Sequence, residues 1–131
     1  MRRDGTLESS DEESLRAKFS FRPHERIRCS ADFQRVKKAG KRAKTPHFGL
    51  NFIPNGLAYH RLGLIVQKRF WPAVGRNRIK RVIREWFRLN KGRIPPPGKD
   101  IVVIARTGAE KLSPGDLLRE FSTVFHKQEN D

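Results

Sequence analysis

The 131-residue chain is long enough for one compact domain with a single core. It has 29 lysines and arginines against 14 acidic residues, and this net charge of +15 indicates a polyanionic partner. No apolar run approaches the roughly 20 residues of a membrane span, and the N-terminus lacks the apolar core of a secretion signal. We therefore expect a nucleic acid partner, no membrane association and a cytoplasmic location.

The first 18 residues are polar, and the first 15 contain five acidic side chains against two arginines. Segments of this composition bury too little apolar surface to offset the entropy lost on ordering. We predict a flexible acidic tail over residues 1–18, a folded domain over 19–127 and a short C-terminal tail over 128–131.

A short helix is expected to open the folded domain. After Ser30, apolar residues recur at helical spacing up to Gly40, which favours a serine N-cap and a glycine C-cap. Cys29 is the only cysteine, which excludes an internal disulfide and a zinc site of several cysteines. We expect it to be a small apolar filler.

Four apolar or basic stretches predict strands. Residues 48–53 and 62–66 are apolar and bounded by proline, glycine, asparagine and arginine, so a hairpin between them is plausible. The basic stretch 41–45 would add a short edge strand. The continuous β-branched run 100–105 is typical of a buried central strand.

The most regular helical pattern runs over residues 74–89, where apolar positions recur at offsets 3, 4, 7 and 8 from Ile79. A closing helix is expected after residues 113–116, which read Ser-Pro-Gly-Asp. That order places a serine N-cap, a proline at the first helical position and an acid three residues after the cap.

One face of the 74–89 helix is strongly basic. On a helical wheel its cations fall on one arc, away from the apolar one: Lys80, Arg81, Arg84 and Arg88. Like charges at this spacing repel by roughly 0.2–0.5 kcal/mol per pair, and only Glu85 offsets them. A mixed-charge helix face would simply be solvated, but this scarcity of acids favours phosphate binding by guanidinium groups.

Two residues allow alternative interpretations. Asn77 could contact a base edge or a ribose hydroxyl, although composition favours a capping role. Phe33, on the first helix, is equally compatible with base stacking and with core packing. We expect the other large aromatic side chains to form the core: Phe48, Phe52, Trp86, Phe87, Phe121 and Phe125.

No catalytic centre is evident in the sequence. The carboxylates of the folded part are scattered, the four histidines are isolated, and no phosphate-binding loop or Ser/His/Asp arrangement is present. We expect no catalytic residue, no metal site in the protein and no organic cofactor. If the protein serves an enzyme, another component should perform the chemistry.

The run from Val74 to Glu85, with Arg76-Asn77-Arg78 at its start, resembles the signature of the bacterial ribonuclease P protein family. The resemblance extends over about residues 22–127. It implies an α+β fold, a single-domain two-layer sandwich of α-β-β-β-α-β-α order with a mostly four-stranded sheet, as in the second domain of a ribosomal protein. It also implies a left-handed crossover through the basic helix, against the usual preference.

By this resemblance, the protein would be the non-catalytic subunit that assists a catalytic RNA in removing the 5′ leader from precursor tRNA. Its partners would be ribonuclease P RNA and the leader, with no obligate protein partner evident, and Mg²⁺ held mainly by the RNA would perform the hydrolysis. The matching positions for catalytic-RNA binding are Arg76, Asn77, Arg78, Lys80, Arg81, Arg84 and Arg88. Those for a leader-binding cleft are Phe33, Lys37, Asn51, Lys68 and Arg69.

The chain also departs from the family pattern. Trp71-Pro72 stands where many relatives have Gly-Asn, and Lys37 and Asn51 occupy cleft positions that are often aromatic. We therefore expect leader binding to depend more on phosphate contacts than on stacking. The alternatives are a structural, ribosomal-type RNA-binding protein and a self-sufficient nuclease, which would need a carboxylate or histidine site.

Overall fold

The computed structural model describes residues 21–130, with side chains up to residue 125, so the predicted tail over residues 1–18 lies outside the described part. The elements follow the predicted α-β-β-β-α-β-α order with three short 3-10 turns added. In sequence they are η1 (Pro23–Glu25), α2 (Ser30–Ala39), β1 (Lys41–Lys44), β2 (Phe48–Pro54), β3 (Arg61–Ile65), α3 (Ala73–Asn90), η2 (Lys91–Arg93), β4 (Lys99–Ala105), η3 (Ala109–Lys111) and α4 (Pro114–Asn130).

The sheet has the strand order β1-β2-β4-β3. Strand β2 is antiparallel to β1 and to β4, whereas β3 is parallel to β4. The expected hairpin between β2 and β3 is therefore wrong, because β4 inserts between them. The reason lies in β4 itself, whose β-branched run is buried on both faces and so takes an interior place in the sheet.

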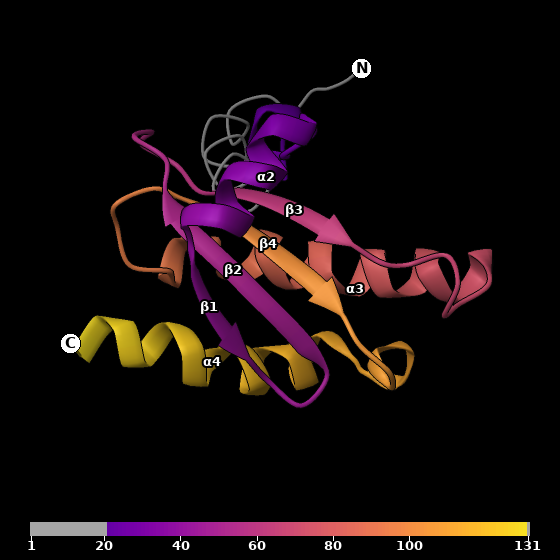
Figure 1. Cartoon of the computed structure of the whole chain (residues 1–131). Coiled ribbons are helices and arrows are strands. Elements are labelled where there is room, and N and C mark those ends of the chain that lie inside the picture. Colours follow the sequence, from indigo (N-terminus) through magenta and orange to yellow (C-terminus); the bar gives the residue numbers. More distant parts are fainter. Residues whose placement is uncertain (1–20, 131) are drawn as a thin grey trace, which may run out of the picture.

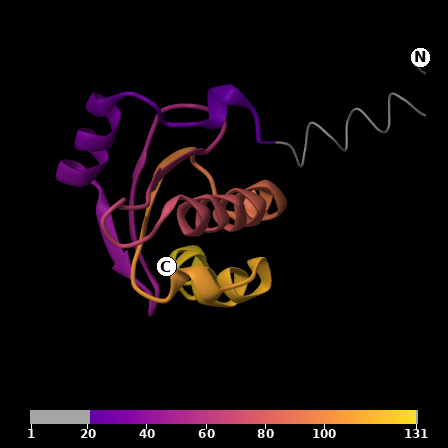
Figure 2. The same ribbon diagram turned by 90° about the vertical axis from the view of Figure 1, so that its right-hand side faces the viewer.

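Helices cover both faces of this sheet. Figure 2 shows α3 and α4 packed side by side against one face and α2 on the other. The connection from β3 to β4 passes through α3, behind the sheet in Figure 1. Viewed with both strands pointing upward and α3 behind them, β4 lies to the right of β3. The crossover is therefore left-handed, contrary to the general preference.

The main core lies between the sheet and the α3–α4 layer. Alternate residues of β2, namely Phe48, Leu50 and Phe52, point into this layer and are at most 3% exposed. There the Phe121 ring of α4 meets the Trp86 ring of α3 edge to face, with centroids 4.6 Å apart. Burying each such side chain contributes about 1.5–3 kcal/mol. The aromatic residues expected in the core are confirmed there.

The helix ends follow the predicted chemistry with one exception. Ser113 and Asp116 cap α4 reciprocally: the Asp116 N–H donates to Ser113 Oγ (3.2 Å), and the Ser113 N–H donates to Asp116 Oδ2 (2.9 Å). Helix α4 continues to Asn130, through most of the predicted C-terminal tail. Helix α2 begins at Ser30, so Cys29 is its N-cap and is exposed rather than buried.

Candidate RNA-binding surfaces

The outer side of α3 forms the first candidate surface. Its core side is apolar because residues such as Ile79 and Ile83 pack on the sheet, which leaves the opposite stripe to solvent. That stripe has residues spaced by four, three and four positions: Asn77, Arg81, Arg84 and Arg88. We call it the α3 stripe.

The cations of the α3 stripe and its flank differ in what they already bind. Within the described residues, the side chains of Lys80, Arg81 and Arg84 form no hydrogen bond and no ion pair. Arg88 instead binds Glu85, with 2.6 Å between Nη2 and Oε2. The sequence does not distinguish these four cations, but in the structure only Lys80, Arg81 and Arg84 keep their charge available for a ligand.

The arginines that flank Asn77 also support the fold. Arg78 donates from Nε to the carbonyl of Glu110 (2.9 Å) and from Nη2 to that of Leu112 (3.2 Å). Arg76 donates from Nη1 to the carbonyl of Trp71 (3.1 Å). These bonds connect the start of α3 to the turn before it and to the segment around η3. Both arginines therefore stabilise the fold in addition to contributing charge.

Asn77 does not cap the helix, so the interpretation that composition favoured is wrong. Helix α3 starts at Ala73 with Pro72 at the N-cap position, which places Asn77 in the second turn. Its side chain is exposed and forms no hydrogen bond with any described residue. The amide is therefore free to bind a ligand.

Positive charge is concentrated near Arg84. Partial burial, followed by the charge of Arg26, lowers the pKa of Arg84. The Arg26 guanidinium lies 4.7 Å from the ring centroid of Phe21, which itself packs edge to face on Phe87 of α3. Two guanidinium groups thus repel each other beside the α3 stripe, and a phosphate group there would relieve the repulsion.

A cleft on the opposite face of the sheet forms the second surface. It lies between α2 and the strands and has a volume of about 470 Å³. Its wall from α2 consists of Phe33, Gln34 and Lys37. Its floor and rim come from all four strands and the segment after β3, namely Arg42, Ala43, Lys44, Gly49, Asn51, Ile65, Gln67, Val102 and Ile104.

The strand register explains this composition. Arg42 pairs with Asn51 and Lys44 with Gly49, so these four side-chain positions share one face of the sheet. Toward the centre the floor becomes apolar, as in the buried Val102. No acidic residue lines the cleft. Cations on the rim and an apolar floor suit a single strand whose phosphates lie outward and whose bases lie inward.

Two glycines shape the cleft floor in different ways. A side chain at Gly63 would meet the Phe33 ring at 2.7 Å, so the bare backbone lets that ring lie against the sheet. At Gly49 the nearest atoms to such a side chain belong to Ile104, at 3.9 Å, so this part of the floor is open. Phe33 therefore packs through one edge and lines the cleft with the rest of its ring.

A buried carboxylate helps to fix helix α2 over the sheet, in addition to the packing of Val36 on Val102. Asp100 of β4 is 0% exposed and accepts hydrogen bonds from Arg35 of α2 (2.6 Å), from Arg61 (2.7 and 2.8 Å) and from Asn55 (2.9 Å). Burial acts to raise the pKa of Asp100, but the bonds from Arg61 and Asn55, together with the charges of Arg61 and Arg35, outweigh it and hold the pKa below its usual value. This cluster sets the position of the cleft wall.

Comparisons with known proteins agree with this geometry. Residues 21–129 match the family Ribonuclease P. The chain belongs to the ribonuclease P protein family. The ribonuclease P protein component of Syntrophobacter fumaroxidans is 63% identical over 114 residues, which cover 86% of this chain and 96% of that relative. The Thermotoga maritima component is 45% identical over 108 residues, covering 82% and 89%.

Solved structures of ribonuclease P proteins share the fold. The Staphylococcus aureus protein matches with a TM-score of 0.69 and 36% identity, covering 79% of this chain and 94% of that one. The Thermotoga maritima protein matches with the same score and identity, covering 79% and 96%. The α+β class implied by the resemblance is confirmed.

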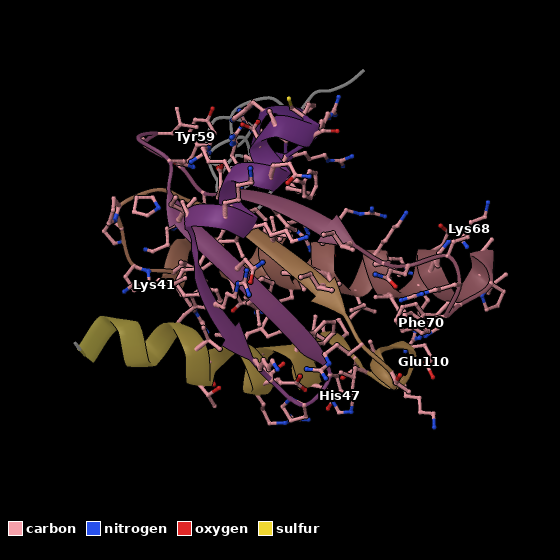
Figure 3. All side chains as sticks on the ribbon, viewed as in Figure 1. Lys41, His47, Tyr59, Lys68, Phe70 and Glu110 are labelled. Atoms are coloured by element: carbon pink, nitrogen blue, oxygen red, sulfur yellow. The ribbon has the colours of Figure 1, made fainter. Side chains whose placement is uncertain are left out.

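Three of the five residues predicted for the ribonuclease P leader cleft line it, and the other two do not. The cleft contains Phe33, Lys37 and Asn51. Arg69 lies beside it, along an adjoining hollow. Lys68 is exposed in the turn before α3 and lines neither space, at the end of the molecule shown in Figure 3.

Several cleft residues of this ribonuclease P protein are not evident from the sequence. Gln34 follows Phe33 on the predicted helix, and Gly49 alternates with Asn51 on a predicted strand, so periodicity could have found both. For Arg42 and Lys44 the sequence predicts a short edge strand but no part in the cleft. Their place beside Asn51 depends on the β1–β2 register, which the sequence does not reveal.

Side chains that could hold a metal ion are not clustered in the described part of this ribonuclease P protein. Among residues 21–125 no three His, Cys, Asp or Glu side chains gather as ligands. The buried carboxylate of Asp100 is already engaged with two guanidinium groups. In the same part of the chain no helix is long and apolar enough to cross a bilayer.

Proposed function

We propose that this protein is the RNA-binding subunit of a cytoplasmic ribonuclease P, which removes the 5′ leader from precursor tRNA. The α3 stripe binds the catalytic RNA, and the cleft binds the single-stranded leader. The observation that carries this proposal is the pairing of two cationic surfaces on opposite faces of one sheet. A helix face suits folded RNA, whereas a narrow cleft with an apolar floor suits an unpaired strand.

The protein's part in the reaction is positioning. Guanidinium forks of the α3 stripe match phosphate oxygens, and the exposed Asn77 amide can donate to or accept from a ribose hydroxyl or a base edge. Rim cations of the cleft, such as Lys37 and Arg42, neutralise leader phosphates. Holding leader and catalytic RNA in one orientation lowers the entropy cost of bringing the scissile bond to the catalyst.

Hydrolysis itself belongs to the RNA in this proposal. Mg²⁺ held mainly by the RNA supplies the metal-ion chemistry of phosphodiester cleavage. The protein residues neutralise phosphates around that site and so lower the Mg²⁺ concentration that the complex needs. No residue of this chain is assigned to the chemical step.

The test is cleavage of a precursor tRNA by bacterial ribonuclease P RNA at low Mg²⁺, with and without the protein. We expect product only in the complete mixture, and none with protein alone. Tight RNA binding without stimulation would favour the structural, ribosomal-type alternative. Cleavage by protein alone would establish a nuclease and overturn the proposal.

A further inference from the structure

The turn between β3 and α3 exposes a large aromatic ring. Phe70 is 55% exposed, although phenylalanine is among the residues that proteins most often bury. The Arg69 guanidinium lies 4.8 Å from its ring centroid. The Trp71 ring meets it edge to face, with centroids 5.8 Å apart. A single exposed phenylalanine is ordinary by itself, so its surroundings decide what it does.

A second hollow of about 380 Å³ lies beside this ring. Its lining includes Arg69, Phe70 and Arg106 and contains no acidic residue. It shares Gln67 and Ile104 with the cleft under α2, so the two hollows are adjacent on one face of the sheet. Figure 3 shows Phe70 beyond the ends of β3 and β4. A strand that leaves the cleft in this direction therefore meets the ring next.

The turn that presents Phe70 is held from several sides. Trp71 is 7% exposed, and its Nε1 donates to Glu110 Oε1 at 2.8 Å. The carbonyl of Trp71 accepts from Arg76, and the Phe70 N–H donates to the carbonyl of Gln67 at 3.2 Å. Figure 3 shows Glu110 close to Phe70 at this end of the molecule. The ring is thus placed before a ligand arrives, which reduces the ordering cost of binding.

We propose that Phe70 stacks an unpaired base of the RNA strand as the strand leaves the cleft, while Arg69 and Arg106 bind the adjoining phosphates. This inference rests on the proposed function, because it extends the path of the leader past the cleft. Aromatic rings hold stacked bases with little sequence preference, since every base has a flat face. The two arginines offer guanidinium forks to phosphate oxygens.

The experiment uses the protein in complex with ribonuclease P RNA and precursor tRNAs with leaders of increasing length. Phe70→Ala should leave the affinity for short leaders unchanged, because they end within the cleft. For longer leaders it should weaken binding by about 5-fold or more, the lower end of what one stacked base contributes. Phe70→Trp should keep wild-type affinity.

Val74→Ala is the matched control, because Val74 is 82% exposed nearby but lies outside the hollow. It should change affinity at no leader length, and all variants should unfold at the wild-type temperature. If Phe70→Ala weakened affinity equally for every leader length, or for tRNA without a leader, the ring would lie against the catalytic RNA. Either result would overturn the inference. Unchanged affinity at all lengths would reject the stacking site while leaving the proposed function intact.

If the wild-type protein fails to stimulate cleavage by ribonuclease P RNA, that result rejects the proposed function, whatever Phe70 does. The stacking site is then tested on the free protein with a single-stranded RNA oligomer longer than the cleft. Weaker binding by Phe70→Ala than by Val74→Ala would still support stacking. Equal binding by the two variants would reject it.

Discussion

Arg78 and Arg81 lie one helical turn apart on α3 and carry the same charge, but their guanidinium groups have different surroundings. Arg81 forms no hydrogen bond or ion pair within the described chain, whereas Arg78 donates to two backbone carbonyls. We expect Arg81→Ala to weaken binding of ribonuclease P RNA without changing the free energy of unfolding. Arg78→Ala should weaken binding and also destabilise the fold by about 1 kcal/mol.

Urea unfolding and a titration with ribonuclease P RNA measure these two effects separately. Arg78→Lys is a useful further variant, because it keeps the charge but not the forked pair of donors. It should recover part of the RNA affinity and little of the stability. Equal stability losses in Arg78→Ala and Arg81→Ala would show that the two carbonyl contacts contribute nothing.

For single residues, the sequence predicts which side chains of α3 are charged and which are buried, but not which of the charged ones already bind another residue. The basic arc of α3 follows from its 3.6-residue period, as does the burial of Trp86 and Phe87. Which cations are already bound depends on segments distant in the chain, such as the carbonyls of Glu110 and Leu112 that accept from Arg78. The capping role of Asn77 is wrong because Pro72 takes the N-cap position and Asn77 lies in the second turn of the helix.

At the scale of elements, α2 is attached to the sheet by its apolar face, where the buried Val36 packs with Val102, and by the ion pair of Arg35 with Asp100. The contribution of Asp100 to stability should be large, because it also pairs with Arg61. Removing one partner of a buried ion pair costs about 3–5 kcal/mol, and we expect this loss for Asp100→Ala in urea unfolding. Arg35→Ala, whose side chain is 40% exposed, should cost less and should loosen α2 alone. Glu85→Ala removes only the exposed pair with Arg88 and should cost at most about 1 kcal/mol.

The same carboxylate makes stability depend on pH. Because the pKa of Asp100 is lower in the folded than in the unfolded chain, its stabilisation is complete above the unfolded value of about 3.9. It is lost as the pH falls through the lower, folded value. The free energy of unfolding should therefore decline more steeply below about pH 4 in the wild type than in Asp100→Asn. Parallel declines in the two proteins would contradict this assignment.

Elements themselves were largely predictable, but their neighbours in space were not. Periodicity and capping residues placed α3 and α4 nearly at their observed starts. The pairing of β2 with β4 joins strands that are far apart in sequence, and the local pattern contains no record of it. The cleft depends on this pairing, because β4 supplies the centre of its floor.

For the whole molecule, α3 and α2 cover opposite faces of the sheet (Figure 2), so the α3 stripe and the cleft beneath α2 also lie on opposite faces. One ribonuclease P protein should therefore hold catalytic RNA and a single-stranded leader at the same time. A labelled leader oligomer bound to the protein should stay bound when ribonuclease P RNA is added at saturation. Displacement of the oligomer by the RNA would show that the two ligands share one surface.

The independence of the two surfaces can be measured with one variant in the cleft and one in the α3 stripe. Gly49→Leu places a side chain on the open floor, where a Cβ atom meets nothing closer than 3.9 Å, and should weaken oligomer binding by about tenfold or more, roughly 1.4 kcal/mol. Gly115→Leu, at an equally uncrowded position of α4, is its control. Arg81→Ala should affect only the catalytic RNA. Sites without shared partners contribute additively. The double variant Gly49→Leu with Arg81→Ala should therefore lose as much affinity for the oligomer as Gly49→Leu, and as much affinity for the catalytic RNA as Arg81→Ala. A smaller loss of either affinity in the double variant would mean that one RNA path crosses both faces.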